Sequence, residues 1–251
     1  MKQLKNIMLR IGVVLAVLYV LILVLVYFLQ RSMLYFPSHR QVASRLTPWS
    51  DGSRIIGYCH NVPKPQTIWL MMHGNAGQAS YREYVLNLMA ETDSLYVLEY
   101  PGYGARPGRP TRESMNRAAS EAYQLLRARS PGIPVCVLAE SIGSGPACAL
   151  ASEKTPPDKI VLAVPFDTLA SVGAEHLPFL PVRLLIRDAW NNVQELKRYK
   201  GPVEIYGAID DVIIPIHHAR ALADAVQQAT FIALKCGHND WSEMEQVKIH
   251  R

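Results

Sequence analysis

Short apolar runs alternate with helix-sized segments along most of this chain, and that alternation restricts its fold more than any other feature. The runs cover residues 67–73, 94–100, 134–140, 159–164, 202–208 and 230–236. Between two of them, Met115, Ala118 and Ala122 recur near helical spacing, and Pro131 follows. Strands separated by helices pair in parallel, so the sequence predicts an α/β fold with a mostly parallel central sheet and helices on both faces.

A nineteen-residue block without charge, residues 11–29, precedes these runs. At ~1.5 Å per residue, a helix of that length spans the ~30 Å hydrocarbon layer of a bilayer. A cleaved signal peptide is the alternative, but its apolar region is usually only about 7–15 residues long and no small-residue cleavage pattern follows here. We predict a single-pass anchor at 1–32, a linker at 33–50 and a catalytic domain at 51–251. Asp51–Gly52 predicts a hairpin turn at the start of that domain.

Basic residues concentrate around the apolar block. Residues 1–50 hold six Lys or Arg and no acidic residue, whereas residues 51–251 hold 20 Lys or Arg against 21 Asp or Glu, a formal charge of −1. The catalytic domain therefore lacks the basic surface that nucleic acids require, and no nucleic-acid partner is predicted. Basic residues flank the block on both sides, and we predict that the catalytic domain lies on the non-cytoplasmic side.

A serine follows the third apolar run, in the segment Ala139-Glu140-Ser141-Ile142-Gly143. In a nucleophile elbow the serine occupies a strained turn between a strand and a helix, so the positions two before and two after it must be small. Ala139 and Gly143 meet that need. The GxSxG-like pattern is weak evidence alone, but a position at the centre of a parallel sheet makes Ser141 the predicted nucleophile.

A serine hydroxyl needs a base, and the base needs a third group to orient it. His238 follows the last apolar run, and the chain order serine, acid, histidine favours it as the base. The acid is Asp210 or Asp211. Spacing from Pro202 and from Pro215 favours Asp211, whereas spacing from Gly207 favours Asp210; we predict Asp211. His217 and His218 fall on the following helix and are expected at the surface.

An oxyanion hole requires backbone donors near the serine. We predict that the N–H groups of Ile142 and Asn75 supply them, the latter from the loop after the first run. His73 suits a role in shaping that loop better than a role as a second base. The cysteines show no CxxC pairing, which indicates buried thiols and no metal site.

At these residues the chain resembles the α/β-hydrolase superfamily, and within it the membrane-anchored, small-lid serine hydrolases related to the abhydrolase-domain depalmitoylating enzymes. The motifs HGNAG, YPGYG, AESIG, DDVIIP and GHND occur in the order of that family, over roughly residues 50–240. The resemblance implies an α/β-hydrolase fold, a triad of Ser141, Asp211 and His238, an oxyanion hole at Asn75 and Ile142, and no cofactor.

Three features depart from the family pattern or limit it. Ala139 replaces the first glycine of the elbow. Arg106 stands where relatives often carry a serine, and we expect its loop to line the entrance and alter substrate preference. The segment after His238 is expected to form a short last helix. The longest insertion, 165–201, is too short for a large cap domain, so we expect a fairly open site.

Together these features predict a membrane-anchored serine hydrolase that cleaves carboxylic ester or thioester bonds through an acyl-enzyme. The substrate is expected to be a small-molecule or lipid-like acyl ester or thioester, because apolar substrates concentrate at a bilayer. A peptidase or amidase of the same fold is one alternative, although no acidic cluster is clearly placed to bind a substrate amino terminus. A catalytically silent hydrolase-fold protein that binds a partner is the other.

Overall fold

The computed structural model describes residues 1–40 and 42–251. The strands are β1 Phe36–Pro37, β2 Thr47–Asp51, β3 Arg54–His60, β4 Ile68–Met72, β5 Ala76–Gly77, β6 Ser94–Leu98, β7 Val135–Glu140, β8 Ile160–Ala163, β9 Val203–Ala208 and β10 Ala229–Leu234. The α-helices are α1 Lys2–Leu34, α2 Arg112–Arg129, α3 Ser144–Ala149, α4 Leu169–His176, α5 Val182–Leu185, α6 Asn192–Leu196 and α7 Ile216–Ala225. Short 3₁₀ segments are η1 Ala79–Leu88, η2 Ser141–Gly143, η3 Leu150–Ser152 and η4 Trp241–Glu243.

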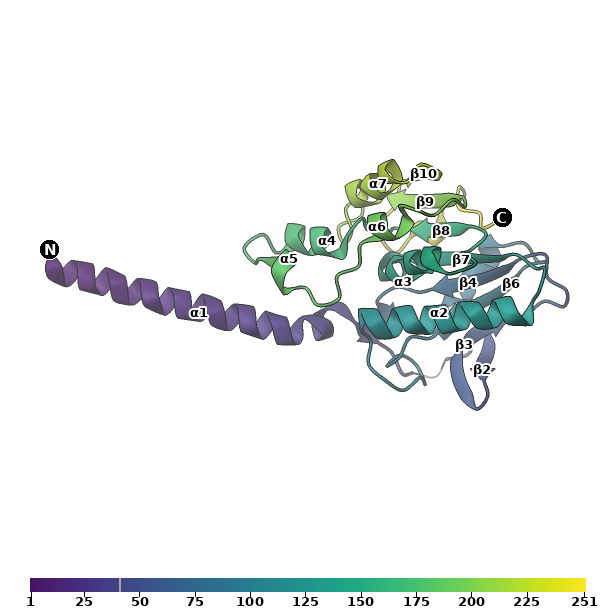
Figure 1. Cartoon of the computed structure of the whole chain (residues 1–251), viewed down its shortest axis with the longest axis horizontal. Coiled ribbons are helices and arrows are strands. Elements are labelled where there is room, and N and C mark those ends of the chain that lie inside the picture. The colour runs from purple at the N-terminus through teal and green to yellow at the C-terminus, as the bar shows by residue number, and fades with distance from the viewer. Residues whose placement is uncertain (41) are drawn as a thin grey trace.

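The main sheet has eight strands in the order β10-β9-β8-β7-β4-β6-β3-β2 (Figure 1). The six strands from β10 to β6 are parallel, and each coincides with one of the six predicted runs, β10 beginning one residue before its run. β3 is antiparallel to β6 and forms the predicted hairpin with β2, whose turn contains Gly52 at φ +59°. The predicted mostly parallel sheet is confirmed, and β7, which precedes Ser141, lies near its centre.

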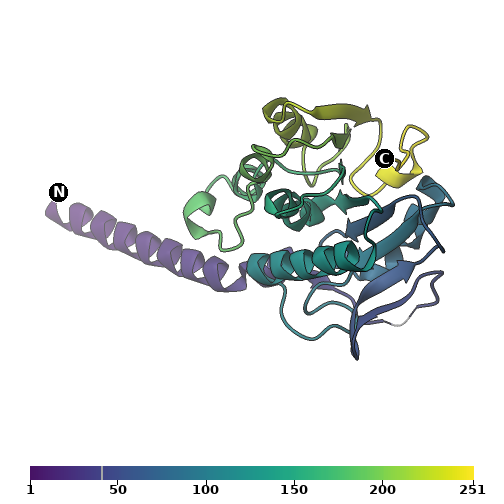
Figure 2. The same cartoon turned by 45° about the vertical axis from the view of Figure 1, so that its right-hand side comes forward.

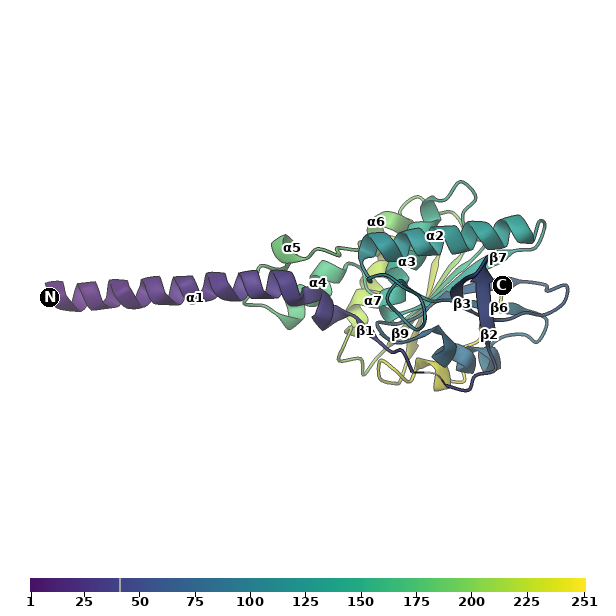
Figure 3. The ribbon, with the colours of Figure 1, turned by 90° about the horizontal axis from the view of Figure 1, so that it is seen from below.

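Alternate residues of the central strands enter two separate cores. Leu70 and Met72 of β4 pack in the core under α2, α3, α6 and α7, whereas Trp69 and Met71 pack in the core under η1 and the C-terminal segment. This period-two pattern makes each strand apolar on both sides, as a covered parallel sheet requires. Two rotated views show the sheet between these layers (Figure 2, Figure 3).

The first helix, α1, extends away from the body of the protein (Figure 1). Among the described residues it is the one helix long and apolar enough to cross a membrane, by length and composition. The linker predicted at 33–50 includes residue 41, which lies outside the described residues. The helix continues to Leu34, and its last turns contact the segment 165–201, which forms the short helices α4, α5 and α6.

Asp188 holds the end of α1 against that segment. Its carboxylate accepts two hydrogen bonds from Arg31, at 2.9 and 3.0 Å, and one each from the Tyr35 hydroxyl and the Arg112 backbone N–H. The carboxylate is nearly fully buried. Burial alone would raise the pKa of Asp188, yet Arg31 and the other donors hold it below its ordinary value.

The predicted last helix is wrong. After His238 the chain forms only the single 3₁₀ turn η4 and then an irregular segment. Trp241, Val247 and Ile249 are buried against the sheet, and Ile249 bridges to Met89. Spacings of six and two residues do not fall on one face of an α-helix, so burial of these three side chains favours an irregular path.

Replacing Asp188 with alanine should destabilise the protein, because it leaves Arg31 and the buried end of Tyr35 without their acceptor. We expect the free energy of unfolding in detergent to fall by about 3 kcal/mol. Denaturant unfolding of the wild-type and variant proteins measures this. Asp210→Ala, at an exposed aspartate, is the control and should change the free energy by less than about 0.5 kcal/mol. Equal stabilities for Asp188→Ala and wild type would contradict the role of this carboxylate.

Candidate active site

Ser141 lies directly after β7, in a backbone conformation that few residues adopt. Its φ is +53°, in the left-handed region, where a side chain other than glycine is strained. The turn passes close to neighbouring chain: a Cβ added to Gly143 would lie 2.3 Å from the Met72 carbonyl oxygen. The strand, strained turn and helix expected of a nucleophile elbow are therefore present, and Gly143 has the tight surroundings predicted for it.

The structure brings the three predicted triad residues together. His238 Nε2 lies 3.0 Å from Ser141 Oγ, and His238 Nδ1 lies 2.6 Å from Asp211 Oδ2. A carboxylate only accepts, so Nδ1 carries the proton and Nε2 has its lone pair toward the serine hydroxyl. The other oxygen of Asp211 accepts the N–H groups of Ile213 and Ile214, both at 2.8 Å, which fixes the carboxylate. Asp210 is exposed, and the geometry favours Asp211.

The two residues predicted to supply oxyanion donors, Ile142 and Asn75, line the same cavity as Ser141. Ile142 is the second residue of η2, so its N–H has no partner within that turn. Asn75 lies in the loop after β4 and lines the same cavities as Ser141. Within the described residues, the Asn75 N–H donates to no backbone acceptor. The rest of Asn75 is tightly held: its carbonyl accepts from Tyr103 and Phe36, and its side chain donates to the Leu34 carbonyl at 3.0 Å.

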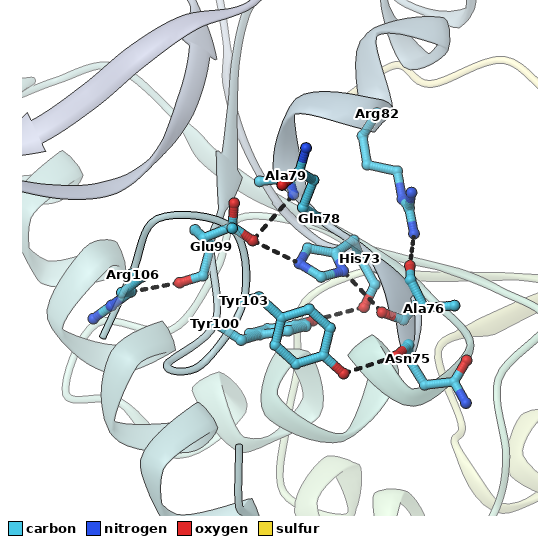
Figure 4. A network of polar contacts seen from close by, with 12 residues as sticks. His73, Asn75, Ala76, Gln78, Ala79, Arg82, Glu99, Tyr100, Tyr103 and Arg106 are labelled. Carbon is cyan, nitrogen blue, oxygen red and sulfur yellow. Dashed lines mark hydrogen bonds and ion pairs between the residues drawn. The ribbon is translucent and has the colours of Figure 1, made fainter. Parts of the chain in front are cut away.

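A buried polar network contacts the loop after β4 that contains Asn75 (Figure 4). His73 is fully buried and its Nδ1 donates to the Gly74 carbonyl at 2.8 Å, while the Tyr100 hydroxyl donates to the His73 carbonyl. Glu99 accepts from the Ala79 N–H and lies 3.6 Å from His73 Nε2. The contacts of His73 agree with a role in shaping the loop, because every one of them is made within the protein interior.

Glu140, the residue before the serine, joins the elbow to this loop. One carboxylate oxygen accepts the Gly74 N–H at 2.8 Å and Arg82 Nε at 2.6 Å, and the other accepts the Tyr84 hydroxyl at 2.5 Å. Burial alone would raise the pKa of Glu140, but Arg82, Tyr84 and Gly74 together lower it. No role was predicted for Glu140. The sequence feature that could have indicated a role is a charged residue at the end of an otherwise apolar strand, because a buried charge requires a partner.

Two cavities meet at Ser141. One, of about 410 Å³, lies between α1 and the segment 165–201 and is lined mostly by apolar side chains. The other, of about 880 Å³, lies on the side of His238 and includes Arg82 and Glu140 in its lining. α1 forms a wall of the first cavity, a contribution that the sequence did not predict. Both volumes fall in the range of small-molecule sites.

Arg106 does not line the entrance, and that expectation is wrong. Its side chain is buried and donates to the Glu99 carbonyl at 2.7 Å, next to the end of β6 (Figure 4). The loop folds back because Gly102 accepts φ +88° and its N–H donates to the Arg106 carbonyl. The guanidinium therefore satisfies backbone at the base of the loop, and neither cavity at Ser141 includes it.

The expected surface position is correct for His217 and wrong for His218. His218 is buried between α7 and α4, where its two ring nitrogens lie 2.8 Å from Asp167 Oδ1 and 3.1 Å from Glu175 Oε2. Glu175, His217 and His218 have their donor atoms close enough together to bind a metal ion. The hydrogen bonds among them already satisfy His218, and they attach the insertion to α7.

All four cysteines are buried, as predicted, and all four are free. Burial raises the pKa of each thiol. Thiols in this state are poor nucleophiles and poor metal ligands, so none of the four is a candidate nucleophile.

Several known proteins are similar to this chain in sequence or in fold. The chain is 33% identical over 228 residues to an uncharacterized protein of Mycobacterium tuberculosis, covering 84% of this chain and 81% of that protein. It is 27% identical over 176 residues to lysophosphatidylserine lipase ABHD12 of Rattus norvegicus, covering 62% of this chain and 44% of the lipase. The structure superposes on a Pyrococcus furiosus esterase with a TM-score of 0.61 and 11% identity, covering 84% and 94% of the two chains.

This chain belongs to the α/β-hydrolase superfamily. No protein-family model matches it. The hydrolase spans less than half the length of the lysophosphatidylserine lipase it matches, so that lipase's substrate is not transferred by the match. The esterase likeness, at 11% identity, establishes the fold, and the relatives support ester hydrolysis as the reaction class.

Gly143→Ala should disrupt the elbow, because the added methyl group meets backbone oxygens of Met72 and His73 at 2.3 and 2.7 Å. We expect the hydrolase to lose about 3 kcal/mol of stability, measured by denaturant unfolding, with loss of any reactivity of Ser141. Gly12→Ala is the control, since nothing lies within 4 Å of its added Cβ. A fully stable and reactive Gly143→Ala protein would show that the turn is less crowded than its geometry indicates.

Glu140→Gln tests the ion pair under the oxyanion loop. The folded-state pKa of Glu140 is lowered, so the carboxylate's contribution is complete above its unfolded pKa and is lost as pH falls through the folded pKa. At neutral pH we expect the variant to be about 2 kcal/mol less stable, a difference that shrinks on acidification. Unfolding measured across acidic and neutral pH tests this against Glu245→Gln, an exposed control. A difference independent of pH would refute the assignment.

Proposed function

We propose that this hydrolase cleaves carboxylic ester or thioester bonds at a membrane surface, through an acyl-enzyme intermediate on Ser141. The observation that carries the proposal is the position of His238, which contacts Ser141 Oγ through Nε2 and Asp211 through Nδ1. An imidazole held between a hydroxyl and a carboxylate in this way is suited to activate the hydroxyl. The lysophosphatidylserine lipase among its relatives supports ester hydrolysis.

The proposed reaction has two halves. His238 Nε2 takes the hydroxyl proton while Ser141 Oγ attacks the acyl carbon, and the resulting tetrahedral oxyanion collapses. The bond to the leaving oxygen or sulfur breaks, and that atom takes the proton from Nε2. Water then attacks the acyl-enzyme and gives its proton to Nε2, after which the carboxylic acid leaves and Ser141 regains its proton. Asp211 stays ionised and stabilises the protonated imidazole.

The oxyanion is proposed to bind the N–H groups of Ile142 and Asn75. Backbone donors fixed before reaction stabilise developing charge without reorganising, at about 3 kcal/mol for each donor. Glu140 contributes indirectly. Its carboxylate accepts the Gly74 N–H and so fixes the His73–Gly74 peptide, which directly precedes the peptide that carries the Asn75 N–H. Glu140 is therefore a positioning residue.

Residues 1–32 are proposed to anchor the hydrolase in a membrane, with 33–50 as linker and 51–251 as the catalytic domain. The length and composition of α1 support the anchor. The non-cytoplasmic position of the catalytic domain stays a prediction from the flanking charges. No step of the mechanism uses a cofactor or a metal ion.

A fluorophosphonate probe, which reacts with activated serines, tests the triad. We expect Ser141 of the wild-type protein in detergent to be labelled, and Ser141→Ala and His238→Ala to lose labelling. Asp211→Asn should lower the rate of ester hydrolysis by ~10⁴-fold, because the imidazole loses its orienting acceptor. Mass analysis of the labelled peptide and ester kinetics measure these effects.

Asp210→Asn is the matched control, because the same change at the exposed neighbour should leave both readouts within about twofold of wild type. Labelling with faster hydrolysis of aminoacyl amides than of esters would favour a peptidase. Well-folded protein without labelling would instead favour a silent binding protein.

A further inference from the structure

The apolar cavity at Ser141 is built partly by the membrane helix itself. Its described lining residues are apolar apart from Gln30, Asn75, Ser141, Gly173 and His176. One wall comes from the last turns of α1 and another from α4, α5 and the residues after them. The cavity ends at Ser141 and Ile142, where the acyl carbon of a substrate has to lie for the proposed reaction.

The wall contributed by α1 is a single helix face. Val26, Gln30, Met33 and Leu34 recur at spacings of four, seven and eight residues, which places them on one side of the helix. Met33 borders both cavities, whereas Val26 borders only the apolar one. Seven residues separate the two, which corresponds to ~10 Å along the axis. The cavity therefore extends from the serine along α1 toward the amino terminus.

Polar contacts hold α1 in this position. The Gln30 side chain donates to the Leu185 carbonyl at 3.0 Å and accepts the Arg187 N–H at 2.8 Å. Asp188 binds Arg31, the next residue of the helix, and the Asn75 side chain donates to the carbonyl of Leu34, its last residue. The last turns of α1 are thus attached to the catalytic domain at three places.

The insertion, residues 165–201, also contacts α1 within its apolar block, residues 11–29. The Tyr19 hydroxyl donates to the Phe179 carbonyl at 2.9 Å, and Tyr19 lies eleven residues before Gln30, or ~16 Å along the helix. Phe179 and Leu184 are 87% and 86% exposed. Both views show α4 and α5 beside the C-terminal half of α1 (Figure 1, Figure 3). If α1 crosses a bilayer, these side chains lie in its apolar layer, where their exposure is favourable.

The second cavity does not suit a hydrocarbon chain. It contains the Arg82 and Glu140 ion pair and polar residues of the segment after His238, such as Asn239. An alkyl chain there would remove water from charged groups without replacing their hydrogen bonds, which is costly. An acyl group attached to Ser141 therefore fits the α1 side, and its leaving group fits the other.

We propose that the cavity between α1 and the insertion binds one long, unbranched acyl chain, which enters directly from the bilayer between α1 and α5. This inference rests on the proposed function, because it assigns the chain of the acyl-enzyme. Met33 and Val26 then set chain length, Met33 near the carbonyl and Val26 near the chain end. The membrane helix is thus a specificity element of the site as well as an anchor.

The test uses the full-length protein in phosphatidylcholine vesicles with butyryl, octanoyl and palmitoyl esters of nitrophenol. Met33→Trp should lower the palmitoyl-to-butyryl ratio of kcat/KM by ~10-fold or more, since it closes the cavity near Ser141. Val26→Trp should lower the palmitoyl-to-octanoyl ratio by a similar factor, because only the longest chain reaches it. Leu21→Trp, on the opposite face of α1, should keep every ratio within about twofold of wild type.

A photoreactive group at the end of a palmitoyl phosphonate gives an independent readout. After the phosphonate reacts with Ser141, cross-links are expected within residues 19–34 or 177–186. Unchanged ratios in both tryptophan variants, or cross-links confined to the His238 side, would overturn the proposal. A short alkyl fluorophosphonate separates the two hypotheses. If it fails to label wild-type Ser141, the proposed function fails. If it labels Ser141 in the wild type and both variants and the ratios do not move, only the chain assignment fails.

Discussion

Ser141 holds its hydroxyl clear of the sheet because its backbone turns through the left-handed region at the end of β7. That conformation is strained for any residue with a Cβ, so the surrounding structure has to supply the energy that maintains it. Gly143 permits the required close approach to Met72, and the parallel strands bring the loops after β4, β9 and β10 to the same edge. The contacts of His238 with Ser141 and Asp211 follow from this shared edge, since carboxyl ends of parallel strands meet there.

The strained turn is joined to the rest of the molecule by a chain of short contacts. Glu140 connects the elbow to Gly74, and Asn75, the next residue, bonds to the Leu34 carbonyl at the end of α1. The two-residue pairing of β1 with β5 continues this connection beyond the helix. The end of α1 is therefore in direct contact with Asn75. The buried charges make the connection stiff, because Glu140 and Arg82 each lose their compensation if the other moves.

The strands, the strained turn and the meeting of Ser141, Asp211 and His238 were predictable because each depends on local sequence pattern and chain order. Ser141, Asp211 and His238 each follow a strand that the apolar runs already defined. The role of Glu140 was not predicted, since its partners Arg82 and Tyr84 are 58 and 56 residues away in sequence. The position of Arg106 was predicted wrongly for the same reason. A positive residue in a glycine-rich loop suggests exposure, and the backbone carbonyls that accept its hydrogen bonds are brought together only when β3 and β6 pair. The prediction of a last helix was wrong because burial of Trp241 and Ile249 outweighed the local preference of this segment for a helix.

The contribution of α1 shows most clearly what sequence patterning leaves out. Hydropathy identifies a span of suitable length, but it treats every face of the helix alike and says nothing of what the last turns contact. In the structure one face of those turns borders the apolar cavity, while Gln30 and Arg31 bond to the insertion. Removing the helix would expose that apolar lining to water and leave the Asn75 side chain and the Asp188 carboxylate without their partners. The first helix and the candidate active site are therefore one structural unit, and the contacts beside Ser141 include this helix.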